Sequence, residues 1–561
     1  ELPDHLVPRH WVWLERLPVN ASGKLNRAAL PEPAADDQVR EADAGPVTPL
    51  EKALHDLWCD ELGAPQAPLT TSFFRLGGHS LSAIRLLNRM RDRLDIDLAM
   101  ADFFLDPTIR GVVARHQPAP AHEVVDTVPM PSTLRRLWRR HHERADPSVY
   151  NVAHRIDLRG ELDPGTLAQA LEDLVGRHQA LRSRAMRRDG GEYVVEVLAG
   201  VPVDLSVTDL SAPAQDTATV ERWCQEQASH VFAMDRAPLF RCRLARLGAD
   251  RWVLLTVFHH AICDGWSMGL IWRDLQELYN ARRADADARL PVLTAQFTDF
   301  ARAEHGLGDE RRAELERFWR AELDGAPLRA ALPYDHPRPE ALSGRGALHT
   351  VVIDGDTPRR VGNTATRLGT TPYAVLAAAF ATWLAGVCGG PADVVLAASS
   401  SNRLQPERSE VVGLLGDAVL LRARIGAART FADLVTQLGG TLFTALDHQE
   451  LPLTDVVELV SPGTGDTLFP TVLFTVVTTP PPALDLRSVS ASVRALPTSG
   501  VARTELYVVL QPQDDAITVI FEYSTDLFTQ ATVEEWSTGF ARLLGEVTKS
   551  PECPLGRLLG P

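Results

Sequence analysis

Residues Trp252–Ser267 read W-V-L-L-T-V-F-H-H-A-I-C-D-G-W-S, an apolar run that ends in two histidines, His259 and His260. The run has the length of a strand buried in a mixed α/β region. Asp264 follows four residues after the second histidine, and Gly265 allows a close turn. A buried imidazole needs a partner for its second nitrogen, which fixes its tautomer and direction. The pattern therefore predicts an ordered chemical site at the end of a core strand.

The double histidine could instead belong to a core histidine pair, a metal centre or a hydrolase. A pair of core histidines fits the pattern as well as a site does. A metal centre needs a third ligand at suitable spacing, and no such residue is near, so we predict no metal. A Ser-His-Asp hydrolase is disfavoured because no G-x-S-x-G element occurs.

Length and composition predict a multidomain globular protein. The 561 residues suggest three or four domains, with 45% hydrophobic and 23% charged residues. The formal net charge of -16 gives no basic footprint for nucleic acid or an anionic membrane. No apolar run has the length of a membrane-spanning helix, and the N-terminus has no signal-peptide pattern, so we expect a cytoplasmic protein. The 6 cysteines lack C-x-x-C spacing and are expected to be free thiols. Because the chain begins at Glu1 without an initiator methionine, we expect it to be a segment of a larger protein.

Changes in composition divide the chain into blocks. Two short stretches rich in alanine and proline or acidic residues read as linkers. The predicted blocks are 1–33, a linker at 34–46, a helical block at 47–117, a linker at 118–127 and an α/β region from 128. The α/β region is too long for one ordinary core, so we expect two lobes, 128–295 and 296–561.

The helical block contains a serine placed where a helix should begin. Thr48, Pro49 and Glu51 predict the start of the first helix of a small bundle. The segment Phe73–Leu81 reads F-F-R-L-G-G-H-S-L, so Ser80 follows a glycine turn. A phosphodiester on this serine would lie near the positive end of the helix. The alternative is that Ser80 is only an N-cap.

L-G-G-H-S-L in such a bundle resembles the attachment motif of peptidyl carrier proteins. The resemblance covers about Pro46 to His116 and implies a four-helix, all-α carrier. It implies that a phosphopantetheinyl transferase loads Ser80 with 4'-phosphopantetheine, whose thiol holds an amino acid or peptide as a thioester.

Residues Leu17–Leu30, L-P-V-N-A-S-G-K-L-N-R-A-A-L, resemble the closing motif of an adenylation domain. Lys24 matches the lysine that contacts the adenylate in that family, whereas Asn26 stands where aspartate is usual. Most of that enzyme is absent, so we expect residues 1–33 to be its tail. The upstream adenylation domain is then a predicted partner.

H-H-x-x-x-D-G resembles the motif of the condensation-domain superfamily, which is related to chloramphenicol acetyltransferase. The resemblance covers about residues 128–555 and implies a nonribosomal peptide synthetase fragment with two acetyltransferase-like lobes arranged as a V-shaped pseudo-dimer. Further segments that resemble family motifs are Arg135–Trp138, Arg177–Arg182, Phe297–Ala301, Leu332–Pro339, His448–Pro452, Phe521–Tyr523 and Asp526–Phe528.

The resemblance implies an acyltransferase that forms peptide bonds. An acceptor amine on a downstream carrier, next to a downstream adenylation domain, would attack a donor thioester carried on Ser80. His260 would act as base or would orient the amine, and His259 would support the turn. Asp264 would be structural and paired with Arg403, and Gly265 would let the backbone approach the reacting centre.

Several residues depart from the family pattern. Pro131 and Leu134 stand where serine and glutamine are usual, and Asp417 stands where asparagine is usual. Arg139, Arg140 and the following two histidines form an unusually basic segment. This segment is either a solvated helix face or a basic rim of the acceptor tunnel formed by Arg139 and Arg140.

Related domain types leave alternatives open. Epimerisation domains share the double histidine but continue differently from Asp264-Gly265-Trp266-Ser267-Met268, and heterocyclisation domains replace the histidines. An inactive recruitment platform of the same fold is an alternative of another class. Such platforms usually degrade the motif, which is intact here. The identities of donor and acceptor are not readable from the sequence.

Overall fold

The computed structural model describes residues 49–558 apart from gaps at 65, 95, 97, 99, 117–122, 145, 189, 212–216, 340–341, 464–470, 478–483 and 497–499. It divides into two compact units, Glu1–Ala121 and His122–Pro561, each of which is described by itself. The predicted adenylation tail at 1–33, with Lys24, and the linker at 34–46 lie outside the described residues.

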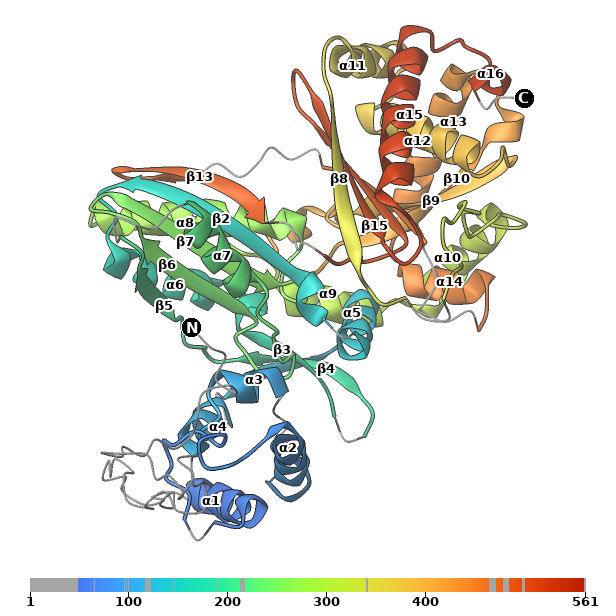
Figure 1. Cartoon of the computed structure of the whole chain (residues 1–561). Coiled ribbons are helices and arrows are strands. Elements are labelled where there is room, and N and C mark those ends of the chain that lie inside the picture. The colour runs from blue at the N-terminus through green and yellow to red at the C-terminus, as the bar shows by residue number, and fades with distance from the viewer. Residues whose placement is uncertain are drawn as a thin grey trace, which may run out of the picture. The chain divides into compact units, whose positions relative to one another are not determined.

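The first unit contains the predicted four-helix bundle (Figure 1). Its core is aromatic, because the Trp58 and Phe103 rings both pack against the Phe73 ring, at centroid distances of 5.8 and 5.7 Å. The first helix begins at Pro49, as the sequence predicts, since proline suits the first helical position. The helices are α1 Pro49–Leu62, α2 Ser80–Leu94, α3 Met100–Leu105 and α4 Ile109–His116.

The second unit is built on two six-stranded sheets, which confirms the predicted two lobes. The sheet of the N-terminal lobe has the order β12-β13-β2-β7-β6-β5. Its central strand β7 is almost wholly buried, as expected of an apolar strand covered on both faces. Its strands are β2 Asn151–Gly160, β5 Leu205–Asp209, β6 Phe240–Arg246, β7 Arg251–His259, β12 Asp485–Leu486 and β13 Val489–Leu496, with helices α6 Pro164–Arg177, α7 Thr217–Ala228 and α8 Gly265–Arg283.

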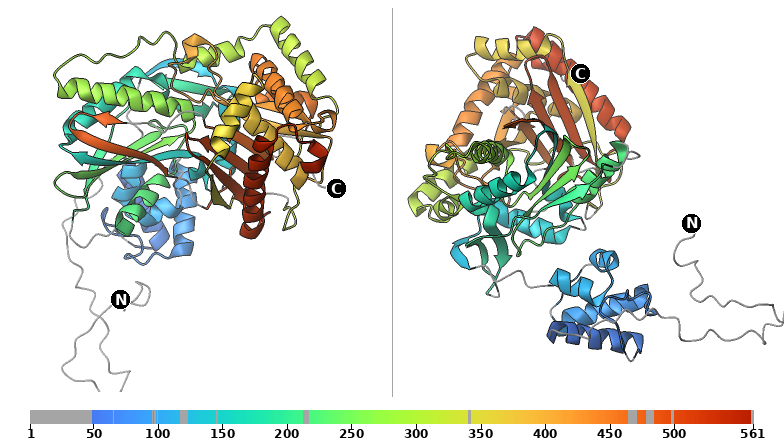
Figure 2. Two further views of the ribbon diagram at one scale, coloured as in Figure 1. Left: turned by 90° about the horizontal axis from the view of Figure 1, so that it is seen from above. Right: turned by 90° about the vertical axis from the view of Figure 1, so that its left-hand side faces the viewer.

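The sheet of the C-terminal lobe has the order β10-β9-β11-β14-β15-β8. Figures 1 and 2 show α15 along one face of this sheet. Its strands are β8 Gly346–Ile353, β9 Asp393–Ser400, β10 Asp417–Arg424, β11 Val472–Val476, β14 Leu506–Pro512 and β15 Ile517–Ser524. Its helices are α10 Asp309–Glu322, α11 Thr357–Arg367, α12 Pro372–Val387, α13 Phe431–Asp447, α14 Leu453–Val460, α15 Gln530–Lys549 and α16 Leu555–Leu558.

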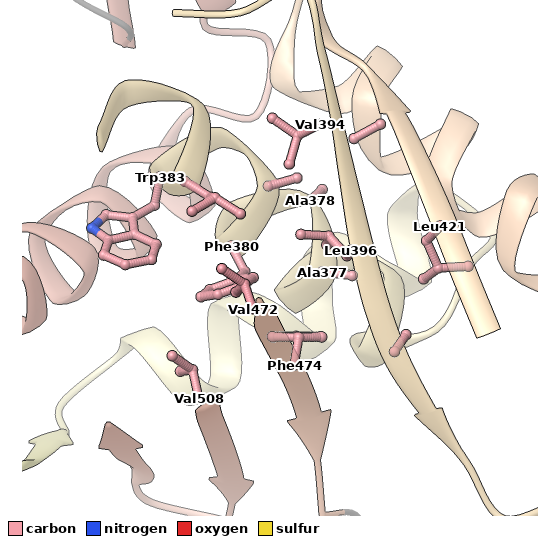
Figure 3. Packing of buried hydrophobic residues seen from close by; sticks show 14 of the residues in the cluster. Ala377, Ala378, Phe380, Trp383, Val394, Leu396, Leu421, Val472, Phe474 and Val508 are labelled. Atoms are coloured by element: carbon pink, nitrogen blue, oxygen red, sulfur yellow. The ribbon is translucent and has the colours of Figure 1, made fainter. Parts of the chain in front are cut away.

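Helix α12 forms the centre of the C-terminal core (Figure 3). The Phe380 ring stacks on Phe474 of β11 with centroids 4.7 Å apart, and Trp383 reaches Phe521 of β15. This helix is apolar on every side because it is covered by strands and by other helices. Among the described residues no single helix is long and apolar enough to cross a membrane, and only the pair α11–α12, bent by 109°, passes by length and composition.

A small third sheet, in the order β1-β4-β3, changes one predicted boundary. Its strands are β1 Val124–Pro129, β3 Ser183–Arg187 and β4 Tyr193–Leu198, and α5 Ser132–Glu143 and α9 Phe297–His305 lie near it in the first core. Strand β1 begins inside the segment 118–127 predicted as a linker, because it pairs antiparallel with β4 from Val124 onward.

The predicted division between the lobes at residue 295 is also wrong. Phe297, Phe300 and Ala301 of α9 belong to the first core, as do the apolar residues of 411–415. Strand β13 leaves the C-terminal lobe and pairs with β2 of the N-terminal sheet. After α9 the chain enters the C-terminal lobe and then returns to the first core twice, at residues 411–415 and again at β12 and β13, because these segments bury their apolar side chains there.

Candidate active site

The predicted histidines lie at the end of β7. His259 is the last residue of the strand and is 0% exposed, whereas His260 is half-buried in the following turn. The His260 N–H donates to the Tyr150 carbonyl at 2.8 Å, and the His259 N–H donates to the Leu239 carbonyl at 2.8 Å. Because β7 lies between β2 and β6, hydrogen bonds to both neighbouring strands hold the end of β7, where this turn begins.

The His260 ring is fixed by one hydrogen bond. Its Nδ1 lies 2.6 Å from the Cys263 carbonyl oxygen, which can only accept, so Nδ1 carries the proton. The other nitrogen, Nε2, then holds a lone pair in the neutral ring. Burial lowers the pKa of His260, the Cys263 hydrogen bond opposes this effect, and the charge of Arg503 adds to it. The ring is therefore neutral at pH 7 and presents an acceptor nitrogen.

Asp264 is the N-cap of α8 and is saturated with hydrogen-bond donors. Its Oδ1 accepts from the Ser267 N–H at 2.9 Å and from Ser267 Oγ at 2.8 Å. Its Oδ2 accepts from Arg403 Nη1 at 2.8 Å and from the Leu415 and Gly416 N–H groups. Burial alone would raise the pKa of this carboxyl, but the Arg403 guanidinium and these hydrogen bonds lower it. Both carboxylate oxygens of Asp264 are therefore occupied by hydrogen-bond donors.

Arg403, the partner that the sequence predicts for Asp264, ties two segments together. Its Nη2 donates to Ser267 Oγ at 3.1 Å and to the Val411 carbonyl at 3.0 Å. Its contacts join the start of α8 to residues 411–416. Gly265, by contrast, begins α8 without a positive φ, and a Cβ there would meet nothing within 4 Å. The protein itself does not require a glycine at this position, so the predicted close turn is not the reason for it.

Residues that the sequence does not single out complete the surroundings of His260. Arg503, from the segment between β13 and β14, lies over the Tyr507 ring at 5.7 Å and 3.9 Å from Glu522. Arg144 donates to the carbonyls of Ala502 and Arg503 at 2.9 and 3.1 Å. Both lobes therefore contribute to the site. No local sequence pattern links position 503 to position 260, which is why Arg503 was not found.

His141 of α5 contacts the first histidine of the motif. Its Nδ1 lies 3.1 Å from His259 Nε2, and the ring centroids are 5.0 Å apart at 75°. Burial lowers the pKa of His141 to about 4 and that of His259 well below its ordinary value. The sequence places His141 only in a basic segment, whereas the structure buries it.

The predicted rim arginines lie on the same helix. Both Arg139 and Arg140 are half-buried, so neither belongs to a freely solvated helix face. Burial, together with the charges of Arg136 and Arg144, lowers the pKa of Arg140 to about 10. Asp417, another departure, lies 3.6 Å from Arg136 and accepts from the Leu453 N–H. This carboxylate therefore links α5 to the start of α14.

In the first unit, Ser80 is the first residue of α2. His79 precedes it as the N-cap: its Nδ1 accepts from the Ser82 N–H at 3.2 Å, and Ser82 Oγ accepts from the His79 N–H at 2.8 Å. The alternative that Ser80 is only the N-cap is wrong, because His79 fills that position. The glycine pair before it is required, since Gly77 has φ 102° and a Cβ at Gly78 would lie 2.3 Å from the Phe73 ring.

The start of α2 fits a phosphopantetheine group. A phosphodiester on Ser80 would lie at the helix end where backbone N–H groups and the helix dipole favour negative charge. The reciprocal cap between His79 and Ser82 holds this end of the helix without using Ser80. Attachment of a covalent group at Ser80 would therefore leave this cap in place.

Family models match both units. The model "Condensation domain" matches residues 124–559, and the model "Phosphopantetheine attachment site" matches residues 52–115. The chain therefore belongs to the condensation-domain family. It joins to that domain a carrier for phosphopantetheine, and this pair of domains is found in nonribosomal peptide synthetases, as the resemblance predicted.

Curated relatives extend far beyond this chain. A probable non-canonical nonribosomal peptide synthetase, CymA of Salinispora arenicola, is 33% identical over 99% of this chain, which spans 7% of CymA. A dimodular nonribosomal peptide synthase of Bacillus subtilis is 30% identical over 99% of this chain and 24% of its own length. Malpinin synthetase of Mortierella alpina is 31% identical over 99% of this chain and 7% of its own length.

Solved structures confirm the fold. The X-domain from teicoplanin biosynthesis aligns with a TM-score of 0.68 and 23% identity, over 78% of this chain and 98% of that one. The first condensation domain of the calcium-dependent antibiotic synthetase aligns with a TM-score of 0.64 and 20% identity, over 77% of this chain and 98% of that one. At these identities the likeness concerns the fold alone.

Proposed function

We propose that this chain forms an amide bond between a donor acyl group carried on Ser80 and an acceptor amine delivered by a downstream carrier. Phosphopantetheine on Ser80 supplies the thiol that holds the donor as a thioester. The observation that carries the proposal is the hydrogen bond from His260 Nδ1–H to the Cys263 carbonyl, at 2.6 Å. This bond leaves the Nε2 lone pair available to hold an N–H of the attacking amine.

His260 acts in this proposal by positioning more than by strong base catalysis. Burial and the charge of Arg503 lower its pKa, so the imidazole is a weak base. An α-amino group has an ordinary pKa of about 8, and part of it is neutral near pH 7 without any base. A neutral imidazole can therefore orient the amine and then take a proton once the nitrogen becomes bonded to carbon. As the C–S bond of the donor thioester breaks, the imidazolium can return this proton to the departing sulfur, which leaves as a thiol.

Asp264, Arg403 and His259 serve this role indirectly. Asp264 and Arg403 hold the start of α8, which fixes the Cys263 carbonyl that orients His260. His259 fixes the other end of the same turn, since its Nδ1 accepts from the Ala261 N–H at 3.1 Å. The open space in front of Gly265 leaves room beside this turn.

Arg139 and Arg140 are proposed as a basic rim of the acceptor channel. Arg140 interacts electrostatically with Tyr150, whose carbonyl accepts from the His260 N–H. Half-buried cations near that approach would attract an anionic acceptor arm and hold it in register.

The proposed setting follows the synthetase relatives. We propose an adenylation domain upstream, adenylation and carrier domains downstream, and a phosphopantetheinyl transferase that loads Ser80. The carrier lies before the condensation domain in the chain, which makes Ser80 the donor site. The cysteines in the part of the chain that the structure describes are free, which supports a reducing, cytoplasmic setting. A bacterial source is supported by relatives such as CymA.

The test is a condensation assay with the full chain. The chain is loaded at Ser80 with a model aminoacyl donor and mixed with a panel of aminoacyl acceptor thioesters, and the product on Ser80 and on the acceptor is followed by mass spectrometry. We expect an amide product with at least one acceptor and none with His260→Ala. A chain that binds partner proteins but forms no amide with any acceptor would instead support the recruitment platform, and a change of donor stereochemistry would support epimerisation.

A further inference from the structure

Two buried histidines from different elements form a direct pair behind the proposed catalytic turn. His141 of α5 is 6% exposed and His259 of β7 is 0% exposed. The distance from His141 Nδ1 to His259 Nε2 is 3.1 Å, and the rings meet edge to face. Since two ring nitrogens share this contact, one of them must carry a proton and the other must accept it.

The neighbouring hydrogen bonds decide which nitrogen carries the proton. The Ala261 N–H donates to His259 Nδ1 at 3.1 Å, so Nδ1 holds a lone pair and the proton of the neutral ring is on Nε2. His259 Nε2–H therefore donates, and His141 Nδ1 accepts. In His141 the proton of the neutral ring is then on Nε2, and a hydrogen bond to the Phe232 backbone raises the pKa of this ring against the effect of burial. One assignment of protons satisfies every partner.

This chain of hydrogen bonds ends at the turn that holds His260. His259 accepts from the Ala261 N–H with its ring and from the Ile262 N–H with its carbonyl, at 3.1 Å in each case. These contacts join the residue before His260 to the two residues after it, and the His260 ring is itself bonded to the Cys263 carbonyl. A rotation or a change of tautomer in the His259 ring would release the Ala261 N–H and loosen the turn.

We infer that His141 is a positioning residue for the proposed amide-forming reaction. It fixes the tautomer and the direction of His259, and through the Ala261 N–H it fixes the place of the His260 imidazole. The inference rests on the proposed function for its kinetic consequence, but its proton assignment stands on the hydrogen bonds alone. Outer partners that orient a functional imidazole change activity by about 10–100-fold when they are removed.

The surroundings keep the pair neutral. His142 and His260 are the other histidines that face it, and Tyr150 and Phe232 cover the His259 ring with aromatic surface. A proton on either member would set two N–H groups against each other in a buried place, which is unfavourable. His142 itself stacks on Trp138 and bonds to its carbonyl at the exposed side of α5. It is therefore a matched control.

The experiment compares three variants of the full chain in the condensation assay. Asparagine can place its Oδ1 near the position of His141 Nδ1 and accept from His259, whereas phenylalanine keeps a ring but cannot accept. We expect His141→Phe to lower kcat by about 10–100-fold with little change in the KM for the acceptor thioester. His141→Asn should retain kcat within about threefold, and the control His142→Phe should match the wild type. Equal losses in His141→Asn and His141→Phe, or full activity in both, would overturn the inference.

A second measurement is independent of activity and of how the variants fold. In the wild-type chain labelled with ¹⁵N-histidine, nitrogen chemical shifts report which ring nitrogen is protonated. We expect His141 and His259 with the proton on Nε2 and His260 with the proton on Nδ1, at pH 7. A proton on Nδ1 of His141 would overturn the inference, whatever the assay shows. If the assay fails with every acceptor but the tautomers are as expected, the proposed function is wrong and the hydrogen bond between His141 and His259 is still supported.

Discussion

Arg403 Nη1 lies 2.8 Å from Asp264 Oδ2, and the two side chains are 0% and 8% exposed. The guanidinium also donates to Ser267 Oγ and to the carbonyls of Ser401 and Val411. A buried ion pair is costly to desolvate, and its removal on one side leaves an unpaired charge. The main effect of this ion pair is therefore to join the start of α8 to the segment from Arg403 to Val411, and its net contribution to stability is small. It fixes the start of the helix that follows the histidine motif.

Asp264→Asn should destabilise the protein strongly. The substitution keeps the shape of the side chain but leaves the Arg403 charge buried and unpaired, at a cost of about 3–5 kcal/mol. We expect a clear fall in the melting temperature of the condensation domain, measured by calorimetry, and a loss of amide formation.

The matched control is an exposed ion pair in the same lobe as Arg403. Arg359 lies 2.5 Å from Asp356, with the side chains 72% and 64% exposed. Exposed pairs contribute little because water screens them. Arg359→Gln should leave the melting temperature unchanged, and an equal effect of the two substitutions would contradict the special role of the buried pair.

Ser80→Ala should abolish loading without unfolding the carrier. His79 and Ser82 cap the start of α2, and the substitution leaves both of these residues unchanged. Incubation with a phosphopantetheinyl transferase should add one phosphopantetheine mass to the wild type and none to Ser80→Ala. The variant Ser82→Ala should still be loaded but should lose about 1 kcal/mol of carrier stability. Loading of Ser80→Ala would place the attachment site elsewhere.

Much of the fold can be predicted from the sequence because its elements have local causes. The apolar run before His259 forms β7, and Pro49 starts α1, as periodicity and proline placement predict. The pairing of Asp264 with Arg403 follows from the family resemblance and from no local pattern. The predictions from the sequence are wrong where segments of one lobe pack into the other lobe. Strand β13 alternates buried and exposed residues, which predicts a strand but does not say which sheet it joins.

The candidate site is predictable only in part for the same reason. His260 and Ser80 lie in compact motifs whose spacing carries the chemistry. His141 and Arg503 are 119 residues before and 243 residues after His260 along the chain. His141 reaches His259, and Arg503 reaches His260, only because distant segments of the chain pack against the end of β7. A basic segment such as Arg139–His142 predicts solvent exposure, whereas burial turned His141 into a neutral acceptor.

The pH dependence of the reaction should follow the acceptor amine and not His260. Burial lowers the pKa of His260 from its ordinary value, so its lone pair persists to a lower pH than that of a free imidazole. The neutral fraction of an amine with a pKa of about 8 falls roughly tenfold per pH unit below that pKa. We expect the log of kcat/KM to rise with a slope of about one up to the amine pKa, without a second break near pH 6.5.

Arg503→Met should add that break. Without the guanidinium charge the pKa of His260 rises toward its ordinary value, so protonation in weak acid removes the acceptor nitrogen and the rate falls more steeply. The control Arg487→Gln, an exposed arginine in the turn between β12 and β13, should keep the wild-type profile. A second break in the wild type, or an unchanged profile in Arg503→Met, would contradict this account.

Neutralising the proposed rim should weaken the binding of the acceptor carrier and leave the rate of the chemical step unchanged. Arg139→Gln with Arg140→Gln removes two half-buried charges next to the approach to His260. We expect the KM for an acceptor carrier to rise by about 3–10-fold at low salt, with kcat unchanged and the difference reduced at high salt. The control Arg159→Gln removes an exposed charge on β2. If acceptor kinetics and their salt dependence stay unchanged, the two arginines serve the helix and not the acceptor.

The stability of the condensation domain should fall in weak acid, in part through His141. Burial lowers the pKa of His141 from 6.5 to about 4 in the folded protein. Between these values the unfolded chain binds a proton that the folded chain does not, so protonation favours unfolding. The stability linked to this residue is fully present above about pH 6.5 and is lost as the pH falls toward 4. The linked free energy is about 3 kcal/mol, from 1.36 kcal/mol per pKa unit.

His141→Asn isolates this contribution because asparagine does not titrate. We expect the free energy of unfolding, measured with urea from pH 7 to pH 4, to fall more steeply in the wild type than in the variant. The difference in slope should correspond to the uptake of up to about one proton on unfolding. If His141→Asn starts less stable at pH 7, the two curves should converge as the pH falls. Parallel curves would mean that His141 already carries its ordinary pKa in the folded protein. His141 and His259 would then not form a neutral pair with the proposed assignment of protons. The inference that His141 positions His260 through this pair would be wrong.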